Sequence, residues 1–231
     1  MTGYNQNTYS AWGGIKTAAS RAALQVRQKM FAALTAKVDL AGLSSVLDVG
    51  ATADKAQMES NFFEQMFPDK RKITALSDQN AGHLAAAYPG LTFVQGNALA
   101  MPFADGTFDL VFSNAVIEHV GNAENQAKFI GECCRVAKKF VFITTPNRRH
   151  PLEFHTALPF LHWLPKKIHR KILTALKKDD LAREENLNLL SNRELAALCE
   201  RATNKQTNKQ TNKQTNKQTN KQTNKQNLLL Y

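Results

Sequence analysis

Short apolar runs alternate with amphipathic stretches along most of the chain. The runs are as long as buried strands and end at turn residues. We predict strands at Ser45–Val49, Lys72–Leu76, Thr92–Gln95, Phe108–Ser113 and Lys139–Thr145. Helices are predicted between them, at Gln57–Phe67, Gln79–Ala87 and Asn122–Val136. Alternation of this kind indicates right-handed crossovers and a parallel sheet covered on both faces, so we expect a doubly wound α/β fold.

Two further helices flank this pattern. From Ile15 to Leu40, apolar residues recur every three or four positions, so residues 1–40 are expected to form an N-terminal helical segment ahead of the main domain. Ser191 and Glu194 form an S-x-x-E capping box, which marks the start of another helix. The main domain is therefore expected to span residues 41–202, with this last helix packed on the sheet.

Residues 146–190 are rich in proline, aromatic residues and histidine. Such a segment after a strand is usually a lid or a substrate-shaping insertion. Residues 166–178 carry six basic side chains. The apolar residues there recur at i, i+4 and i+8 and follow a tryptophan: Trp163, Ile168, Ile172 and Leu176. This stripe either lies on an anionic membrane, steers a lipid-linked acidic glycan, or packs on the domain while its lysines are solvated.

Residues 203–226 repeat Thr-Asn-Lys-Gln six times. The repeat has no apolar residue, so it cannot bury enough surface to offset the entropy of ordering, and we expect disorder. Polar β-aggregation is the alternative, but one lysine in every four residues works against it. Residues 227–231, with the sequence NLLLY, are strand-like again.

Composition narrows the class of protein. The chain has 231 residues, 43% of them hydrophobic and 21% charged, which excludes collagen-like, disulfide-framework and wholly disordered proteins. The formal charge of +11 falls to +5 without the six lysines of the repeat, which gives no argument for nucleic acid. Cys133, Cys134 and Cys199 lack metal-ligand spacing and are expected to be buried reduced thiols. No secretory leader or membrane span is expected, which predicts a cytoplasmic protein.

The first predicted strand and its turn are the expected ligand site, because α/β sheets bind ligands at the carboxyl ends of their strands. They read VLDVGATAD, from Val46 to Asp54. With Asp48 and Gly50, this stretch resembles VLDVGxGxG, motif I of the class I S-adenosylmethionine-dependent methyltransferases. Thr52 and Asp54 replace the later glycines of the motif. The resemblance implies that Asp48 and Gly50 bind the cofactor, with the turn at Gly50 beside its amino-acid end; an ordinary strand-to-helix turn is the alternative.

The resemblance continues after the next two strands. Asp78 ends the run ITALSD, where the family has a carboxylate for both ribose hydroxyls; an Asx turn or a helix N-cap is the alternative. The stretch GNALAMPFADGTFDLVFSNAVIEHV matches the family pattern GDAxxLPFxDxxFDxVxxxxxxxH. By this resemblance Asn97 contacts the adenine edge, and Ala98 and Leu99 supply backbone and packing contacts. Asn114, at the end of the fourth strand, would lie at the sulfonium end.

The resemblance covers about Ser45 to Ala202 and is strongest for the methyltransferase type 11 group. It implies a mostly parallel, Rossmann-like sheet and S-adenosyl-L-methionine as cofactor. The run TTPNRRHPLEFHTALPFLHWLPKK is similar to a bacterial subset linked to surface-polysaccharide genes. The acceptor is therefore expected to be a small molecule or a lipid-linked glycan, methylated at oxygen. Residues 227–231 would be a remnant of the final strand, with the repeat in place of the sixth.

Two histidines are the candidates for a general base in this reaction. His119 follows Glu118, and His155 forms a group with His150 and Glu153. We predict catalytic roles for His119 and His155 in removing a proton from a hydroxyl. Alternatively, His119 caps or packs a helix and the others hold the lid together.

Other functions are weighed against this one. A catalytically inactive methyltransferase-like fold that serves as a binding or scaffold module is favoured by the glycine-poor turn and by the repeat. Nucleic acid is not expected as acceptor, because the fourth strand ends in SNAV and not in the (D/N)PP(Y/F) signature. No metal is expected. The sequence leaves the oligomeric state open.

Overall fold

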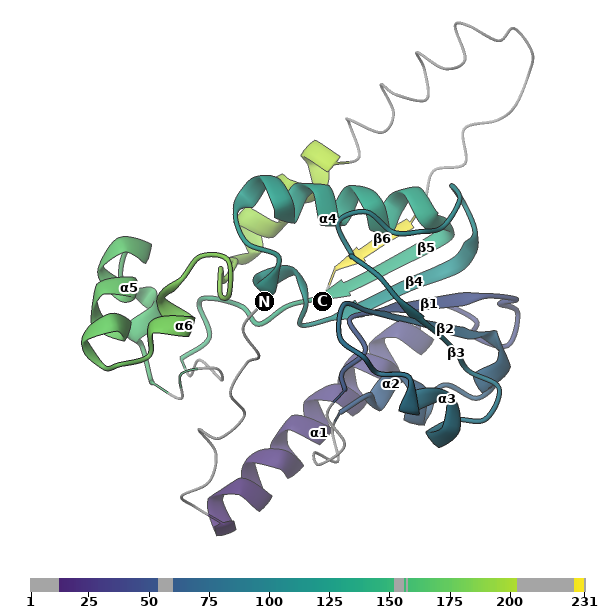
Figure 1. Ribbon diagram of the computed structural model, residues 1–231, viewed down its shortest axis with the longest axis horizontal. Coiled ribbons are helices and arrows are strands. Elements are labelled where there is room, and N and C mark those ends of the chain that lie inside the picture. The colour runs from purple at the N-terminus through teal and green to yellow at the C-terminus, as the bar shows by residue number, and fades with distance from the viewer. Residues whose placement is uncertain (1–12, 54–59, 152–155, 157, 203–226, 231) are drawn as a thin grey trace, which may run out of the picture.

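The computed structural model describes residues 13–53, 60–151, 156, 158–202 and 227–230. The described residues form one six-stranded sheet in the order β3-β2-β1-β4-β5-β6, with every neighbouring pair parallel (Figure 1). The strands are β1 Val46–Val49, β2 Ile73–Ser77, β3 Thr92–Gln95, β4 Phe108–Asn114, β5 Ala137–Thr144 and β6 Asn227–Leu230. The prediction of a doubly wound parallel sheet is confirmed.

Helices cover both faces of this sheet (Figure 1). Helix α4 and the helical residues 192–202 lie on one face, and α1, α2 and α3 lie on the other. The α-helices are α1 Gly13–Thr35, α2 Phe62–Met66, α3 His83–Ala87, α4 Ala123–Val136, α5 Lys166–Ala175 and α6 Asp179–Ala182. Three 3-10 turns are described as well: η2 Lys70–Lys72, η3 Ile117–His119 and η4 Leu161–Trp163.

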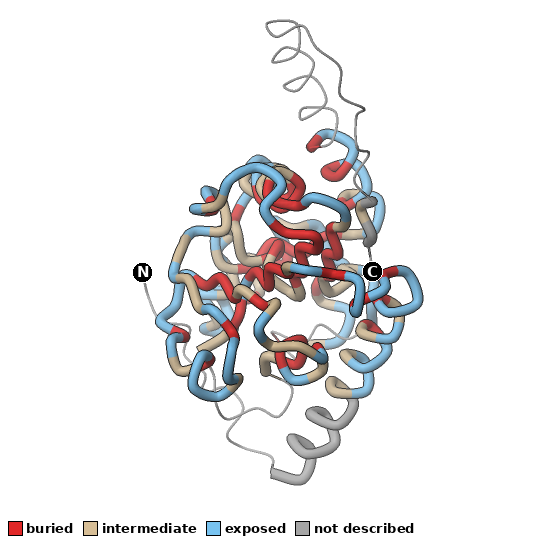
Figure 2. The backbone as a smooth tube through the Cα atoms, turned by 90° about the vertical axis from the view of Figure 1, so that its right-hand side faces the viewer, coloured by how far each residue is buried: buried red, intermediate tan, exposed pale blue. Residues whose placement is uncertain are grey.

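The buried residues form one hydrophobic cluster on each face of the sheet (Figure 2). The first joins the inner side of α4 to Leu195 and Leu198 of the last helix. The second includes Leu34 and Val38, so the N-terminal helix contributes to the core of the domain. All three cysteines are free and buried in the first cluster, and burial raises the pKa of Cys134 to about 12. The expected reduced thiols are confirmed.

Side-chain caps explain where two of the helices begin. Asn122 Oδ1 accepts hydrogen bonds from the backbone N–H groups of Glu124 and Asn125 and so starts α4. The predicted capping box is confirmed: Ser191 N donates to Glu194 Oε2 at 2.8 Å, and Glu194 N donates to Ser191 Oγ at 3.3 Å. Helix α3 is shorter than predicted and starts at His83.

The segment 146–190 leaves the sheet after β5 and returns to its own starting point. Asn147 forms a parallel bridge with Leu190, and Arg148 N donates to Leu190 O at 2.9 Å. Between these two points, α5 and α6 stand to one side of the sheet (Figure 1). Because the two ends of this segment are bonded to each other, it fits the expected insertion. Its role as a lid stays a prediction.

Strand β6 extends the sheet beside β5. Its register pairs Phe140 with Asn227 and Val141 with Leu228, and Leu228 packs against the first hydrophobic cluster. The structure thus describes residues 227–230 as a strand, and their place as a remnant of the family's final strand stays a prediction. The expected disorder of the repeat falls on residues 203–226, which lie outside the described residues. Within the part of the chain that is described, no helix has both the length and the apolar character needed to cross a bilayer.

Candidate active site

The chain turns sharply at Gly50, immediately after β1. Gly50 has a φ of +98°, and its N–H donates to Leu76 O at 2.8 Å. A Cβ at this position would lie 2.1 Å from Cγ2 of Val116. Both the left-handed backbone and the close approach therefore require glycine. The turn lies where strand order reverses, since β1 has β2 on one side and β4 on the other, and this is where such sheets bind ligands.

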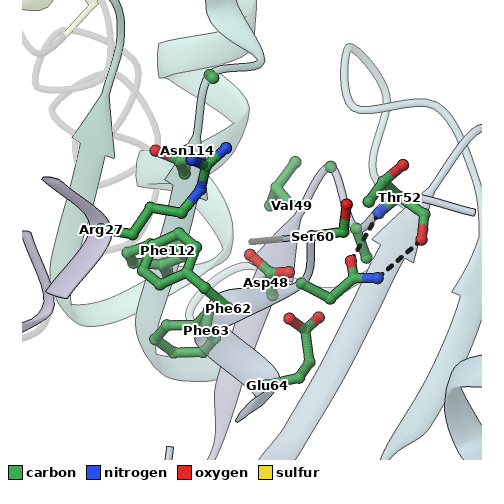
Figure 3. A pocket seen from close by; sticks show the side chains of 14 residues that line it. Arg27, Asp48, Val49, Thr52, Ser60, Phe62, Phe63, Glu64, Phe112 and Asn114 are labelled. Atoms are coloured by element: carbon green, nitrogen blue, oxygen red, sulfur yellow. Dashed lines mark hydrogen bonds between the residues drawn. The ribbon is translucent and has the colours of Figure 1, made fainter. Parts of the chain in front are cut away.

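A pocket of about 190 Å³ opens beside this turn (Figure 3). Three of the predicted cofactor residues line it: Asp48, Gly50 and Asn114. The rest of its wall comes from the turn after β1, the end of β4, the start of α2 and Arg27 of α1. The side chain of Asn61 holds the backbone at Thr52 in place beside the pocket. Its Oδ1 accepts from Thr52 N at 2.9 Å, and its Nδ2 donates to Thr52 O at 3.0 Å.

Two buried carboxyl groups meet in this pocket. Asp48 is 5% exposed and Glu64 is fully buried, and the two side chains point toward each other (Figure 3). Apart from the carboxyl group of Asp48, the oxygens of Glu64 have no hydrogen-bond partner in the described part of the chain. Burial raises the pKa of Asp48 well above its usual value, and the charge of Glu64 raises it further. Burial also raises the pKa of Glu64.

An aromatic wall separates these acids from Arg27 (Figure 3). The guanidinium carbon of Arg27 lies 5.9 Å from the ring centre of Phe62, and Phe63 stacks on Phe112 at 4.2 Å. Arg27, Asn61 and Glu64 were not among the site residues predicted from the sequence. Only Glu64 carries a signal in the sequence, because it is the one charged residue within the apolar run FFEQMF.

The predicted ribose and adenine residues follow β2 and β3. Gly96 N donates to Ser77 O at 2.8 Å, and Gln95 Nε2 donates to Asp78 O at 3.1 Å, so the ends of these strands lie together. Asp78 is exposed, and it stands outside the lining of the pocket, as do Asn97, Ala98 and Leu99. The side chain of Asn97 forms an Asx turn, with its Oδ1 accepting from Leu99 N at 2.8 Å.

The end of β4 is fixed to both neighbouring strands. Ser113 Oγ donates to Val49 O at 3.0 Å, and Thr144 Oγ1 donates to Asn114 Oδ1 at 2.7 Å. Ala115 follows with a φ of +55°, a left-handed conformation that is costly for alanine, and it also lines the pocket. Strained residues of this kind cluster at functional sites.

His119 lies one turn beyond the pocket wall, in η3. Its Nδ1 is 2.6 Å from Asn186 O, which belongs to the segment 146–190. Neighbouring Glu118 is buried and accepts from Thr145 Oγ1 at 2.9 Å. His155, the second catalytic candidate, lies outside the described residues, as does Glu153.

The remaining histidine contacts hold the insertion together. His150 O lies 2.6 Å from His162 Nε2 and accepts from Trp163 Nε1 at 3.2 Å. These contacts use the backbone carbonyl of His150, so the role predicted for its side chain stays a prediction. Among the described residues, no group of three or more His, Cys, Asp or Glu side chains is placed to hold a metal ion.

Residues 47–143 match the family model of the methyltransferase domain. This part of the chain is similar in sequence to methyltransferase domains. The domain is 34% identical over 82 residues to a protein of Mycobacterium tuberculosis and to one of Mycolicibacterium smegmatis, both described as probable S-adenosylmethionine-dependent methyltransferases. These matches cover 34% of this chain and 29% and 31% of the two relatives. The chain thus matches less than a third of their length.

A solved structure supports the same fold. A methyltransferase from Galdieria sulphuraria superposes with a TM-score of 0.52 at 18% identity, covering 78% of this chain and 61% of that one. At this identity the likeness concerns the fold. Together with the family match, it confirms the resemblance that motif I and the stretch from Gly96 to Val120 indicated.

Proposed function

We propose that the methyltransferase domain binds S-adenosylmethionine and transfers its methyl group to a small-molecule acceptor. The observation that carries this proposal is the pocket beside Gly50. It combines a backbone turn that requires glycine with a buried pair of carboxyl groups, at the edge of the sheet where this fold binds ligands. The described relatives of the domain are named for the same cofactor.

The amino-acid end of the cofactor fits this pocket by charge. That end carries an ammonium group, which needs buried acceptors of opposite charge. Glu64 offers two buried oxygens whose one partner among the described residues is the facing carboxyl group of Asp48. Arg27, in the same lining, has the charge that suits the cofactor's carboxylate. We therefore assign Asp48, Glu64 and Arg27 to the amino-acid end.

The adenosine end would run along the ends of β2 and β3. We assign Asp78 to the ribose hydroxyls, because it is an exposed carboxylate directly after β2, and β2 lies beside β1, where strand order reverses. Asn97 would contact the adenine edge through its Nδ2, since its Oδ1 already accepts from Leu99 N. Ala98 and Leu99 would supply the backbone and packing contacts.

When bound, the cofactor supplies a methyl group on a sulfonium, ready for in-line displacement. The protein must hold the acceptor at the right distance and angle and take up its proton. His119 is suited to take up this proton. Its Nδ1 must carry a hydrogen to bond with Asn186 O, which leaves the lone pair of the neutral ring on Nε2. We propose O-methylation of a small molecule or a lipid-linked glycan, with His119 and His155 as the candidate bases.

Calorimetric titration of the full chain with S-adenosylmethionine tests this assignment. Asp78→Ala removes a charged acceptor of two hydrogen bonds, each worth ~1.5–3 kcal/mol, so affinity should fall at least about tenfold. The thermal midpoint should barely move, because Asp78 is exposed. Asp180→Ala removes an equally exposed aspartate from α6 and is the matched control. Equal affinity of wild type and Asp78→Ala would remove Asp78 from the site.

One observation favours an inactive binding module as the second candidate. Thr52 stands where motif I has a glycine, and both its backbone N–H and its C=O are bonded to Asn61. These backbone groups are therefore engaged within the protein. An absence of heat on mixing with S-adenosylmethionine would favour the binding module, whereas heat followed by methyl transfer would support the enzyme.

A further inference from the structure

Large apolar side chains are exposed on the insertion that follows β5. Among the described residues, six large apolar side chains are strongly exposed, and five of them lie on or beside η4 and α5. We call these five the α5 patch: Phe160, Trp163, Leu164, Ile168 and Leu176. The rings of Phe160 and Trp163 form an edge-to-face pair with centres 4.9 Å apart, and both are about half exposed. Such clustering marks an interaction surface.

The other side of α5 is firmly attached to the domain. Leu173 is fully buried and His169 nearly so. Arg170 pairs with Glu184 at 3.0 Å, and Lys166 Nζ donates to Asn188 Oδ1 at 2.8 Å. The helix therefore presents one face to the protein and leaves the side that carries Ile168 uncovered.

Positive charge surrounds the α5 patch. Residues 160–178 contain six basic side chains and no acidic one. Lys166 and Arg170 make the contacts with the domain described above. Lys167, Lys171 and Lys177 are exposed. Lys167 and Lys171 are one helical turn apart and flank the exposed apolar stripe. A helix with exposed apolar and aromatic side chains flanked by lysines is typical of helices that lie in a membrane interface.

We propose that the α5 patch docks on the surface of an anionic phospholipid bilayer. Helix α5 would lie in the plane of the interface, with Trp163 and Ile168 among the headgroups and acyl chains. Lys167 and Lys171 would reach the lipid phosphates through their flexible stems. A second copy of the chain fits less well, because a symmetric contact would bring the lysines of both copies together. This inference does not depend on the proposed methyl transfer.

Co-sedimentation of the full chain with vesicles tests the proposal. The probes are vesicles of phosphatidylglycerol mixed with phosphatidylcholine, and vesicles of phosphatidylcholine alone. We expect binding to the anionic vesicles that weakens as salt rises. The apolar variant Trp163→Ser with Ile168→Ser and the charge variant Lys167→Glu with Lys171→Glu should each lower the bound fraction by about tenfold or more.

Matched controls come from α1 and from the turn that follows it. Val26→Ser removes the sixth exposed apolar side chain, and Lys29→Glu with Lys37→Glu changes the net charge as much as the patch charge variant does. Both controls should bind like wild type. If Lys29→Glu with Lys37→Glu lost as much binding as the patch charge variant, net charge alone would explain the binding, and the proposal would be overturned. Absence of binding to anionic vesicles would overturn it too, as would lipid-free dimers in sedimentation velocity that the patch variants abolish.

Discussion

The carboxyl groups of Asp48 on β1 and Glu64 on α2 face each other inside the domain (Figure 3). Burial raises the pKa of both groups, and the charge of Glu64 raises that of Asp48 further. A buried acid pair in which Glu64 has only Asp48 as a hydrogen-bond partner among the described residues costs stability, and proteins keep such arrangements where function needs them. Stability and cofactor affinity should therefore respond in opposite directions when the pair is changed.

Glu64→Gln tests this opposition. In the folded state Glu64 holds its proton to a higher pH than in the unfolded chain. Wild-type stability therefore falls as pH rises above 4.5, the ordinary pKa of a glutamate in the unfolded chain. The amide lacks this penalty. We expect Glu64→Gln to raise the thermal midpoint at neutral pH by about 2–4 °C, as ~1 kcal/mol would, with the gain vanishing below pH ~4. Affinity for S-adenosylmethionine should fall in the same variant.

Glu132→Gln is the control with the opposite sign. Burial raises the pKa of Glu132, but hydrogen bonds from Arg135 and Met101 outweigh it and the net pKa is lowered. The ionised carboxylate of Glu132 thus stabilises the fold at any pH above its pKa in the unfolded chain. Glu132→Gln should therefore lose stability at neutral pH and match wild type in acid. Thermal denaturation across pH measures both variants. A Glu64→Gln protein no more stable than wild type at neutral pH would contradict the argument.

Gly50→Ala should destabilise the domain and block the pocket. The new Cβ would meet Val116 at 2.1 Å in a left-handed conformation, and the two effects together cost about 2–4 kcal/mol. Val116→Ala in the same chain should recover the steric part only. Gly106→Ala is the control, because Gly106 has a φ of +63° with nothing within 4 Å of its Cβ position, so it reports the backbone cost alone. Urea titration measures all four proteins; equal losses at Gly50 and Gly106 would refute the close contact.

The sequence predicted the sheet because each buried strand is a short apolar run bounded by turns. Three of the predicted cofactor residues, Asp48, Gly50 and Asn114, line one pocket, since parallel strands bring their carboxyl ends to one edge, and their binding role stays a prediction. Arg27 and Asn61 were missed because their roles depend on how α1 and the start of α2 pack against that edge. Packing of this kind joins residues far apart in the chain and leaves no local pattern. The register of β6 beside β5 is of the same kind.

Substitution of His119 separates its two possible roles. As a general base, His119→Ala should lower turnover by ~10²–10⁴-fold while S-adenosylmethionine affinity stays within a factor of about two. If His119 instead only holds Asn186 O in place, the same change should lower the thermal midpoint and leave turnover nearly unchanged. His155→Ala is measured in parallel, and a fully active double variant would leave the reaction to positioning alone.

The Thr-Asn-Lys-Gln repeat has an order that the genetic code explains. These four residues can be spelled ACA AAC AAA CAA, which is the four-nucleotide unit ACAA written three times. Because four is not a multiple of three, every reading frame of this unit encodes the same cyclic tetrapeptide. A flexible linker has no need of these residues in this order. We therefore predict that the tract is a slippage-prone microsatellite inside the coding sequence.

Slippage by one unit would keep the peptide repeat and replace the residues after it. Residues 227–230 form β6, which pairs with β5 from Phe140 to Ile143 and adds Leu228 to the core. A shifted frame would remove this strand, leave the edge of β5 unpaired and lower the yield of stable protein. Clones would then switch expression of the domain on and off. Sequencing the locus across sibling colonies tests this: varying numbers of ACAA units are expected, and a tract of constant length or codons that break the ACAA pattern would refute it.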